Sequence, residues 1–107
     1  MNVYSARRLE LSCPLYFFGP NACEGEATLR DLSTGGCHGW SIIPVPLGLE
    51  IRLSIALPDD HKWPLVVNKA RVRWQNGEEF GLEFLTMGAE QRDRLQQFLW
   101  QAKGPWK

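Results

Sequence analysis

A small set of residues in this sequence has the types and spacing to hold an anionic ring ligand. Asp31 and Ser33 stand two positions apart at the end of an expected strand, and a glycine pair ending at Gly36 follows them. Short polar side chains beside glycine backbone let a flat ligand approach closely. Arg7 and Arg8 lie about two dozen positions upstream, and a guanidinium offers a planar fork of donors that fits phosphate oxygens or the O6/N7 edge of guanine. An arginine pair folded over this turn would complete a nucleotide pocket.

Length and composition limit the kind of molecule that can carry such a pocket. The 107 residues suit one domain with its own apolar core, so we expect residues 1–107 to form a single domain. The 12 Lys and Arg balance the 12 Asp and Glu, so there is no global positive field of the kind that drives nonspecific DNA or RNA binding. Cys13, Cys23 and Cys37 have neither disulfide-framework nor zinc-knuckle spacing and suit a reducing cytoplasm. No leader-like or membrane-spanning apolar run is present, so we expect a cytoplasmic protein without membrane insertion.

Alternating apolar residues predict a chain built mostly of β-strands. The expected strands run from Leu9 to Phe18, Glu26 to Asp31, Cys37 to Ser41, Glu50 to Leu57, Leu65 to Gln75 and Phe80 to Phe84. Pro14 lacks an N–H and places the start of the first strand at an edge. Asn76 and Gly77 tolerate the positive φ of both central positions in a type I′ turn, so they should join the last two strands. Val72 and Trp74 share the expected inward face of the strand before that turn.

The period of the apolar residues changes near the end of the chain. Leu95, Phe98 and Leu99 recur at three- and four-residue intervals, which predicts an amphipathic helix over about residues 89–102. Short antiparallel strands followed by one terminal helix suggest a sheet closed into a small barrel, with the helix covering an opening. Residues 1–8 lack periodic apolar residues and are interpreted as a flexible N-terminal arm, whose order could depend on a ligand.

The order of these motifs resembles the PilZ domain family over roughly Arg7 to Leu99. The resemblance rests on the arginine pair, a Cys13-Pro14 step, Asp31-x-Ser33-x-x-Gly36, a tryptophan-containing hairpin ending in Phe80-Gly81-Leu82-Glu83-Phe84, and a closing helix. It implies a mostly β fold, a small antiparallel six-stranded β-barrel with a C-terminal α-helix. It also implies a bacterial receptor for the second messenger cyclic di-GMP. In that family the acidic or amide side chain meets the Watson–Crick edge of a guanine, the serine assists, and the glycine lets the base lie against the backbone.

The arginine signature of that family, Arg-x-x-x-Arg, is present in part. With Pro14 as the proline that follows the signature, Arg8 takes its first place and Ser12 its second. A hydrogen bond to a charged group contributes about 1.5 to 3 kcal/mol, so one missing arginine weakens binding by roughly tenfold to a hundredfold. Arg7, on a flexible arm, could partly substitute. The cyclic di-GMP site implied by the resemblance consists of Arg7, Arg8, Asp31, Ser33 and Gly36.

Two other functions stay open from the sequence. Ser12 favours a protein-interaction adaptor that resembles family members which do not bind the nucleotide. Such an adaptor would act by contact with an unidentified protein partner. Trp100 and Trp106 fall outside the helix stripe and could form an exposed patch for that partner or ordinary cover for the barrel mouth. The other tryptophans are expected to be core or half-buried. A barrel that binds single-stranded nucleic acid is more remote, because the net charge is neutral.

Catalysis and metal binding have little support in the sequence. The Cys37-His38 pair and the loop 59–61 contain acid, base or metal-ligand types, but neither cluster is spaced with a third ligand for zinc. Ser33 and the cysteines lack a recognisable nucleophile motif. We therefore expect a binding protein that is not an enzyme, with no metal or cofactor, with cyclic di-GMP as its ligand, and with neither DNA nor RNA as a partner.

Overall fold

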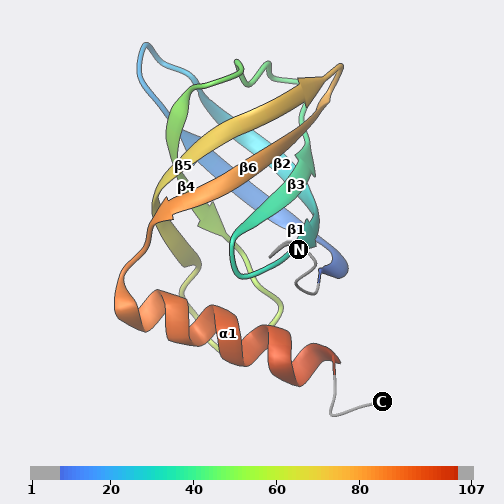
Figure 1. Cartoon of the computed structure of the whole chain (residues 1–107), viewed down its shortest axis with the longest axis vertical. Helices are drawn as coiled ribbons and strands as arrows, with labels where there is room; N and C mark the ends of the chain where they lie inside the picture. The colour runs from blue at the N-terminus through green and yellow to red at the C-terminus, as the bar shows by residue number, and fades with distance from the viewer. Residues whose placement is uncertain (1–7, 104–107) are drawn as a thin grey trace, which may run out of the picture.

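The computed structural model describes residues 8–103 and shows a closed β-barrel with one helix across an end (Figure 1). The elements are β1 (Leu9–Phe18), β2 (Glu24–Leu32), β3 (Gly36–Trp40), β4 (Glu50–Ile55), β5 (Leu65–Asn76), β6 (Glu79–Thr86) and α1 (Ala89–Lys103). All neighbouring strands are antiparallel, in the closed order β1-β2-β3-β6-β5-β4. The mostly β, six-stranded barrel with a C-terminal helix is therefore confirmed. Of the expected arm, residues 1–7 lie outside the described residues.

The β5–β6 hairpin differs from its sequence-based prediction. Asn76 remains in the strand, opposite Glu79, so the two central residues of the turn are Gly77 and Glu78. Gly77 has a φ of 66°, whereas Glu78 does not have a positive φ. Positive φ at the first central position alone is typical of a type II′ turn. The hairpin is confirmed, but the type I′ turn centred on Asn76 and Gly77 is wrong.

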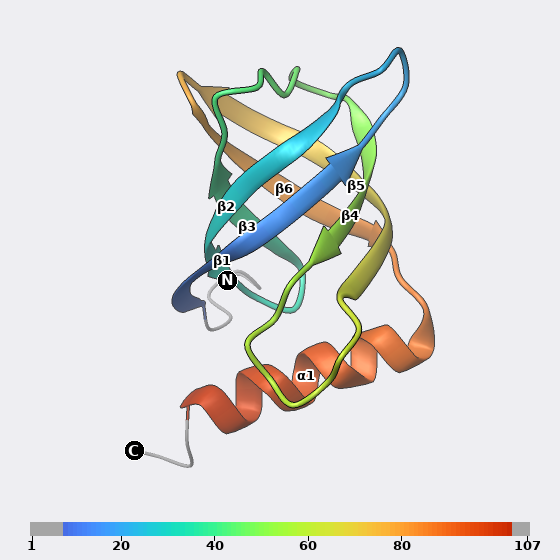
Figure 2. The same cartoon turned by 180° about the vertical axis from the view of Figure 1, so that it is seen from behind.

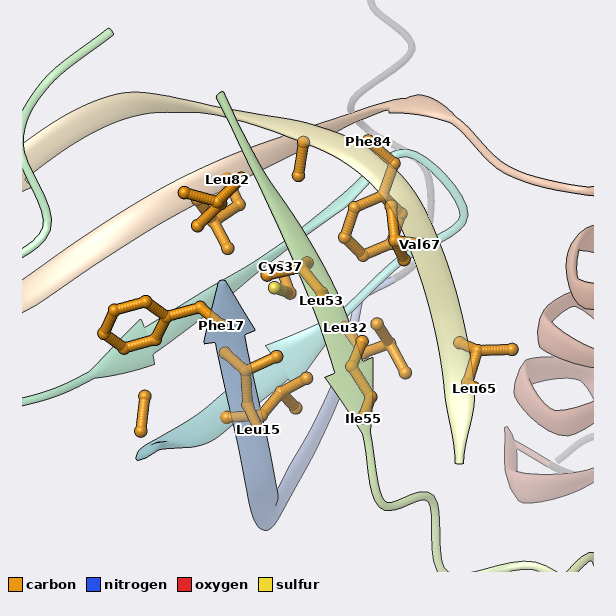
Figure 3. Packing of buried hydrophobic residues seen from close by; sticks show 14 of the residues in the cluster. Leu15, Phe17, Leu32, Cys37, Leu53, Ile55, Leu65, Val67, Leu82 and Phe84 are labelled. Atoms are coloured by element: carbon orange, nitrogen blue, oxygen red, sulfur yellow. The ribbon is translucent and has the colours of Figure 1, made fainter. Parts of the chain in front are cut away.

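Apolar side chains from all six strands fill the interior of the barrel (Figure 3). Leu15, Phe17, Leu53, Ile55 and Val67 have no solvent-accessible surface. Because successive strand residues point to opposite faces, each strand contributes alternate residues to this core. Full burial of one such side chain contributes about 1.5 to 3 kcal/mol, so this interior stabilises the closed barrel.

The barrel closes between β1 and β4 over a short seam. The pairing runs from Leu15 to Phe18 on β1, while the earlier residues of β1 are paired with β2. Pro14 sits just before the seam, opposite Thr28 of β2, and its carbonyl accepts a hydrogen bond from Ala56 N at 3.0 Å. Pro14 has no N–H to donate. It is tolerated because it lies at the end of the β1–β4 pairing, which agrees with the edge position expected from the sequence.

Helix α1 lies across one end of the barrel, against the loop between β4 and β5 (Figure 2). Leu95 and Leu99 are buried and join the core cluster, as the helical period predicts. Arg94 donates two hydrogen bonds to Asp59 of that loop, from Nε to Oδ2 and from Nη2 to Oδ1, each at 3.0 Å. The helix that was expected to cover a barrel opening is thus present. The Arg94–Asp59 contact and apolar packing both hold it in place. Within residues 8–103, no helix is long and apolar enough to cross a bilayer.

Two of the tryptophans, Trp63 and Trp74, are more exposed than the sequence predicts, whereas Trp40, which exposes 37% of its surface, is half-buried as expected. Trp63 exposes 75% of its surface, so the expectation of a core or half-buried residue is wrong there. Trp74 is 43% exposed, because the β5–β6 pairing shifts between Val72 and Trp74 and turns the indole outward. Its expected inward orientation is therefore wrong as well. Trp100 is exposed at 61%, and Trp106 lies outside the described residues.

Candidate ligand-binding site

A register shift in β2 turns Asp31 to the outer face of the barrel. Leu29 and Leu32 are both fully buried, although a regular strand would place Leu29 and Asp31 on the same face. The β2–β3 pairing shifts between these two residues, so Arg30 is an extra residue and the alternation restarts after it. The Asp31 carboxylate consequently points to the surface, where it is about one fifth exposed.

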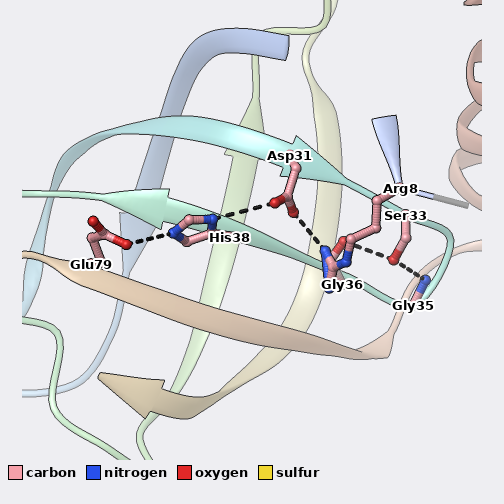
Figure 4. Close-up of polar contacts among 7 residues, drawn as sticks. All are labelled: Arg8, Asp31, Ser33, Gly35, Gly36, His38 and Glu79. Carbon is pink, nitrogen blue, oxygen red and sulfur yellow. Dashed lines mark hydrogen bonds and ion pairs between the residues drawn. The ribbon is translucent and has the colours of Figure 1, made fainter. Parts of the chain in front are cut away.

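The turn between β2 and β3 is held by its own hydrogen bonds (Figure 4). Ser33 N donates to Gly36 O at 2.9 Å. The Ser33 hydroxyl donates to Gly36 O and accepts from Gly35 N, both at 3.3 Å. Gly35 O accepts from Phe84 N at 2.9 Å, which ties the turn to β6. Ser33 is buried, so its hydroxyl shapes the turn on which a ligand would rest.

Gly36 has a structural role that the sequence did not reveal. A Cβ added to Gly36 would lie 2.2 Å from the carbonyl oxygen of Leu82, whereas one added to Gly35 would meet nothing within 4 Å. Neither glycine has a positive φ. The close approach of β3 to β6 therefore requires glycine at position 36. This requirement exists without any ligand.

Arg8 reaches the Asp31 carboxylate from the start of β1. Its Nη1 donates to Asp31 Oδ1 at 2.6 Å, and about half of its side-chain surface is exposed. A hydrogen bond between two charged groups is stronger than a neutral one. The structure thus brings Arg8, Asp31, Ser33 and Gly36 to one place, while Arg7 lies outside the described residues.

His38 continues this polar chain along the surface of β3 (Figure 4). Its Nδ1 lies 3.3 Å from Asp31 Oδ2, and its Nε2 lies 3.1 Å from Glu79 Oε1. A neutral imidazole can donate to one of these carboxylates, and an imidazolium can donate to both. Together the two contacts orient the imidazole ring. The first contact also holds Asp31 through Oδ2, the carboxylate oxygen that Arg8 does not contact.

Trp74 lies over Gly81 and beside His38. A Cβ on Gly81 would lie 2.1 Å from Trp74 Nε1, so the absence of a side chain there lets the indole cover the strand. The ring centroids of His38 and Trp74 are 5.3 Å apart, with the planes tilted by 43°. Trp74 was not predicted as a site residue, because an unbroken alternation in β5 would turn its side chain inward. A glycine inside a strand, here Gly81, signals a bulge or a close approach and could have indicated it.

These side chains surround one surface pocket of about 590 Å³. Ligand pockets for small molecules typically measure roughly 300 to 1,000 Å³. Its lining residues are Arg8, Asp31, Ser33, Thr34, Gly35, Gly36, Cys37, His38, Arg73, Trp74, Gly81, Leu82 and Glu83. The pocket combines two arginines, two carboxylates and an aromatic pair, which suits a ligand with phosphates and flat polar bases.

The thiol that lines the pocket is not reactive. Burial raises the pKa of Cys37 far above its ordinary value, and the charge of Asp31 and the Cys13 thiol raise it further, while Arg8 opposes them. The thiolate is the nucleophilic and metal-binding form, so Cys37 stays an inert neutral group. Among residues 8–103, no three His, Cys, Asp or Glu side chains are grouped to hold a metal ion.

The chain thus has the architecture of a small antiparallel barrel module with a polar, partly aromatic pocket on its outer surface. The sequence profile of the PilZ domain matches residues 6–101. The chain therefore belongs to the PilZ domain family, which confirms the resemblance noted in the sequence.

Several solved structures share this fold. The PilZ domain of CeSA from a cellulose-synthesizing bacterium has a TM-score of 0.68 at 15% identity, covering 86% of this chain and 93% of that one. The Bacillus subtilis inhibitor of motility MotI (DgrA) has a TM-score of 0.73 at 20% identity, covering 92% of this chain and 49% of that one. Borreliella burgdorferi PlzA, solved in complex with cyclic di-GMP, has a TM-score of 0.64 at 12% identity, covering 86% and 39%. A comparison with curated protein sequences gives no match.

Proposed function

We propose that this chain is a cyclic di-GMP receptor that binds the nucleotide in the pocket beside Asp31. Its membership of the PilZ family supports this, as does its structural likeness to a protein solved with that nucleotide. The observation that carries the proposal is the position of Arg8, whose guanidinium lies 2.6 Å from the Asp31 carboxylate inside a pocket of about 590 Å³. We place the receptor in the cytoplasm, where its three free thiols stay reduced.

Each group at the pocket has a distinct part in binding. The Asp31 carboxylate accepts two parallel hydrogen bonds from the N1–H and N2 amino group of a guanine. Arg8 leaves or shares its contact with Asp31 and donates to a phosphate or to the O6/N7 edge of a base. Trp74 offers a face on which a base can stack, next to the His38 ring. Ser33 and Gly36 keep the turn in the shape that this arrangement needs.

Isothermal titration with cyclic di-GMP tests the proposal. Arg8→Ala and Asp31→Ala should each abolish most of the binding, because each removes a charged partner of the ligand. Arg92→Ala, an exposed arginine of α1, is the matched control and should bind like the wild type. No heat and no chemical-shift change at high micromolar nucleotide would reject the receptor function.

The second candidate is an adaptor that works by protein contact without the nucleotide. The exposure of Trp100 on α1, at 61%, favours it, because large exposed aromatic side chains are enriched in protein interfaces. This function predicts a wild type that gives no titration with cyclic di-GMP and a partner that is lost on Trp100→Ala. Retained nucleotide binding by the wild type would contradict it.

A further inference from the structure

We propose that Arg73 supplies the second phosphate-binding guanidinium of the pocket. This inference rests on the proposed function and assigns a binding role to a residue outside both sequence signatures of the family. Ser12 occupies the place where the first signature has its second arginine. Ser12 is exposed on β1 and is not among the residues that line the pocket. Among the lining residues, the cationic side chains come from Arg8 and Arg73.

A bulge in β5 brings Arg73 to the pocket. Val72 pairs with Leu82 and Trp74 pairs with Gly81, so Arg73 is an extra residue on β5. A bulge of this kind re-aims the side chains beside it. Val72 is buried, and both Arg73 and Trp74 are exposed, with about half of the Arg73 side chain accessible. The guanidinium of Arg73 therefore lines the same pocket as the indole of Trp74.

The pocket already contains two arginine–carboxylate pairs that a ligand can exchange. Arg8 contacts Asp31 at 2.6 Å, and Arg73 Nη2 lies 2.6 Å from Glu83 Oε1. The second contact is an ion pair that lacks the alignment of a hydrogen bond, since Glu83 Oε1 is buried without a hydrogen-bond donor. A guanidinium has five N–H donors, so Arg73 can turn toward a phosphate at little cost in hydrogen bonds. Cyclic di-GMP has two phosphodiesters, each with one negative charge, and one arginine for each would neutralise both.

Glu83 keeps a positive neighbour when Arg73 turns to the ligand. It stands directly opposite Arg71 in the pairing of β5 with β6. Opposite charges in such cross-strand positions attract each other. Arg71 donates a hydrogen bond to Glu50, and its positive charge also acts on Glu83. When Arg73 turns from Glu83 to phosphate, the Glu83 carboxylate therefore still has a cation nearby.

Titration with cyclic di-GMP and phosphorus-31 NMR of the bound nucleotide test the role of Arg73. Arg73→Ala should weaken binding by roughly tenfold to a hundredfold, as expected for the loss of one charged hydrogen-bond partner. It should also shift a phosphorus resonance of the bound nucleotide. Arg52→Ala, an exposed arginine on β4, should leave both the affinity and the spectrum unchanged. Glu83→Gln removes the competing charge with little change of shape and should tighten binding several-fold.

The outcomes separate this inference from the receptor function. If Arg73→Ala binds like the wild type while Arg8→Ala does not bind, Arg73 is not a ligand residue and the receptor function stands. Should Arg73→Ala fail to fold, Glu83→Gln decides the matter: tighter binding supports the exchange, and equal or weaker binding overturns it. A wild type that binds no nucleotide overturns both proposals.

Discussion

Single residues at and beside the β2–β3 turn differ in their roles in the structure and in the proposed binding. Asp31 and Arg8 present charge to the pocket, whereas the buried Ser33 holds the backbone of the turn. Gly36 has a structural role like that of Ser33, because its missing Cβ lets β3 approach β6. A motif that looks like a uniform ligand signature thus contains residues that the fold itself needs.

Gly36→Ala should destabilise the protein by about 3 kcal/mol or more, at the upper end of overpacking costs, because the new Cβ would lie 2.2 Å from the Leu82 oxygen. Gly35→Ala is the matched control. It has no neighbour within 4 Å of its new Cβ and should change stability by less than about 0.5 kcal/mol. Urea unfolding of both variants without nucleotide measures the difference. Equal stabilities would show that Gly36 is not fixed by strand packing.

Trp74→Ala should weaken cyclic di-GMP binding by about 1 to 3 kcal/mol, the usual contribution of one base stacked on an aromatic side chain. Trp74→Phe should keep most of the affinity, because it retains an aromatic face. Trp63→Ala provides the control, since Trp63 is highly exposed on the loop beside α1 and does not line the pocket. An equal loss in Trp63→Ala and Trp74→Ala would argue against stacking in the pocket.

The residues of the site differ in how far the sequence could predict them. Asp31, Ser33 and Gly36 follow from a short motif, and the structure places them together with Arg8. His38 lies on β3, whereas Arg73 and Trp74 are neighbours on β5, so no local motif links the histidine to the other two. Two register shifts decide that Asp31 and Trp74 face outward. A strict period of two cannot show which residue is the extra one in a bulge.

At the scale of secondary structure, charge fixes the helix against the barrel. Burial alone would raise the pKa of Asp59. The hydrogen bond from Arg94, the N–H of His61 and the positive charge of Arg94 outweigh it and lower the pKa below its usual value. The Val66 N–H of β5 also donates to Gln91 Oε1 at 2.9 Å, so the β4–β5 loop and the start of β5 are both bonded to α1.

Asp59→Asn should cost about 1.5 to 3 kcal/mol of unfolding free energy at pH 7, the usual range for hydrogen bonds to a charged group. The folded-state pKa of Asp59 is lowered, so its contribution is complete above the unfolded pKa of about 3.9 and is lost as pH falls through the folded value. The difference between wild type and variant should therefore shrink below about pH 4. Asp60→Asn, which removes the neighbouring exposed charge, controls for net charge. A cost that persists unchanged at pH 2 would point to packing instead.

Strand and helix positions were the part of this fold most open to prediction. The alternation in β4 and the three- and four-residue spacing in α1 both correspond to buried faces. The turn at Gly77 and Glu78 shows the limit, because one residue of offset changes the turn type without altering the apolar pattern. The short strands and the terminal helix suggested a small closed barrel, and the family resemblance supported it. Which strands meet at the closure was not predicted, since long-range pairing between β1 and β4 leaves no local signal.

Residues 8–103 form one barrel around a single core, so damage at the β1–β4 seam should reach every strand. Leu53 has no exposed surface and pairs with Phe17 where β1 meets β4. Both the barrel closure and the pocket on its outer wall depend on this packing.

Leu53→Ala should destabilise the protein by about 2 to 5 kcal/mol, as buried leucines do when a cavity replaces them. Ile42→Ala, at a loop residue that is mostly exposed, should cost less than about 0.5 kcal/mol. Circular dichroism and tryptophan fluorescence should give coincident unfolding curves in both variants, because one core unfolds cooperatively. Separate transitions by the two probes would contradict a single cooperative unit.

Two of the three cysteines are buried, so their chemical modification can report how often the barrel opens. Burial raises the pKa of Cys13 to about 11, and Cys37 is shielded still further, whereas Cys23 is partly accessible. An alkylating reagent should therefore modify Cys23 quickly in the native state. It should modify Cys13 and Cys37 only at the rate at which the strands of the barrel separate. Mass spectrometry can count those modifications. Any nucleotide that holds the walls together would slow the second and third modifications while leaving the first unchanged.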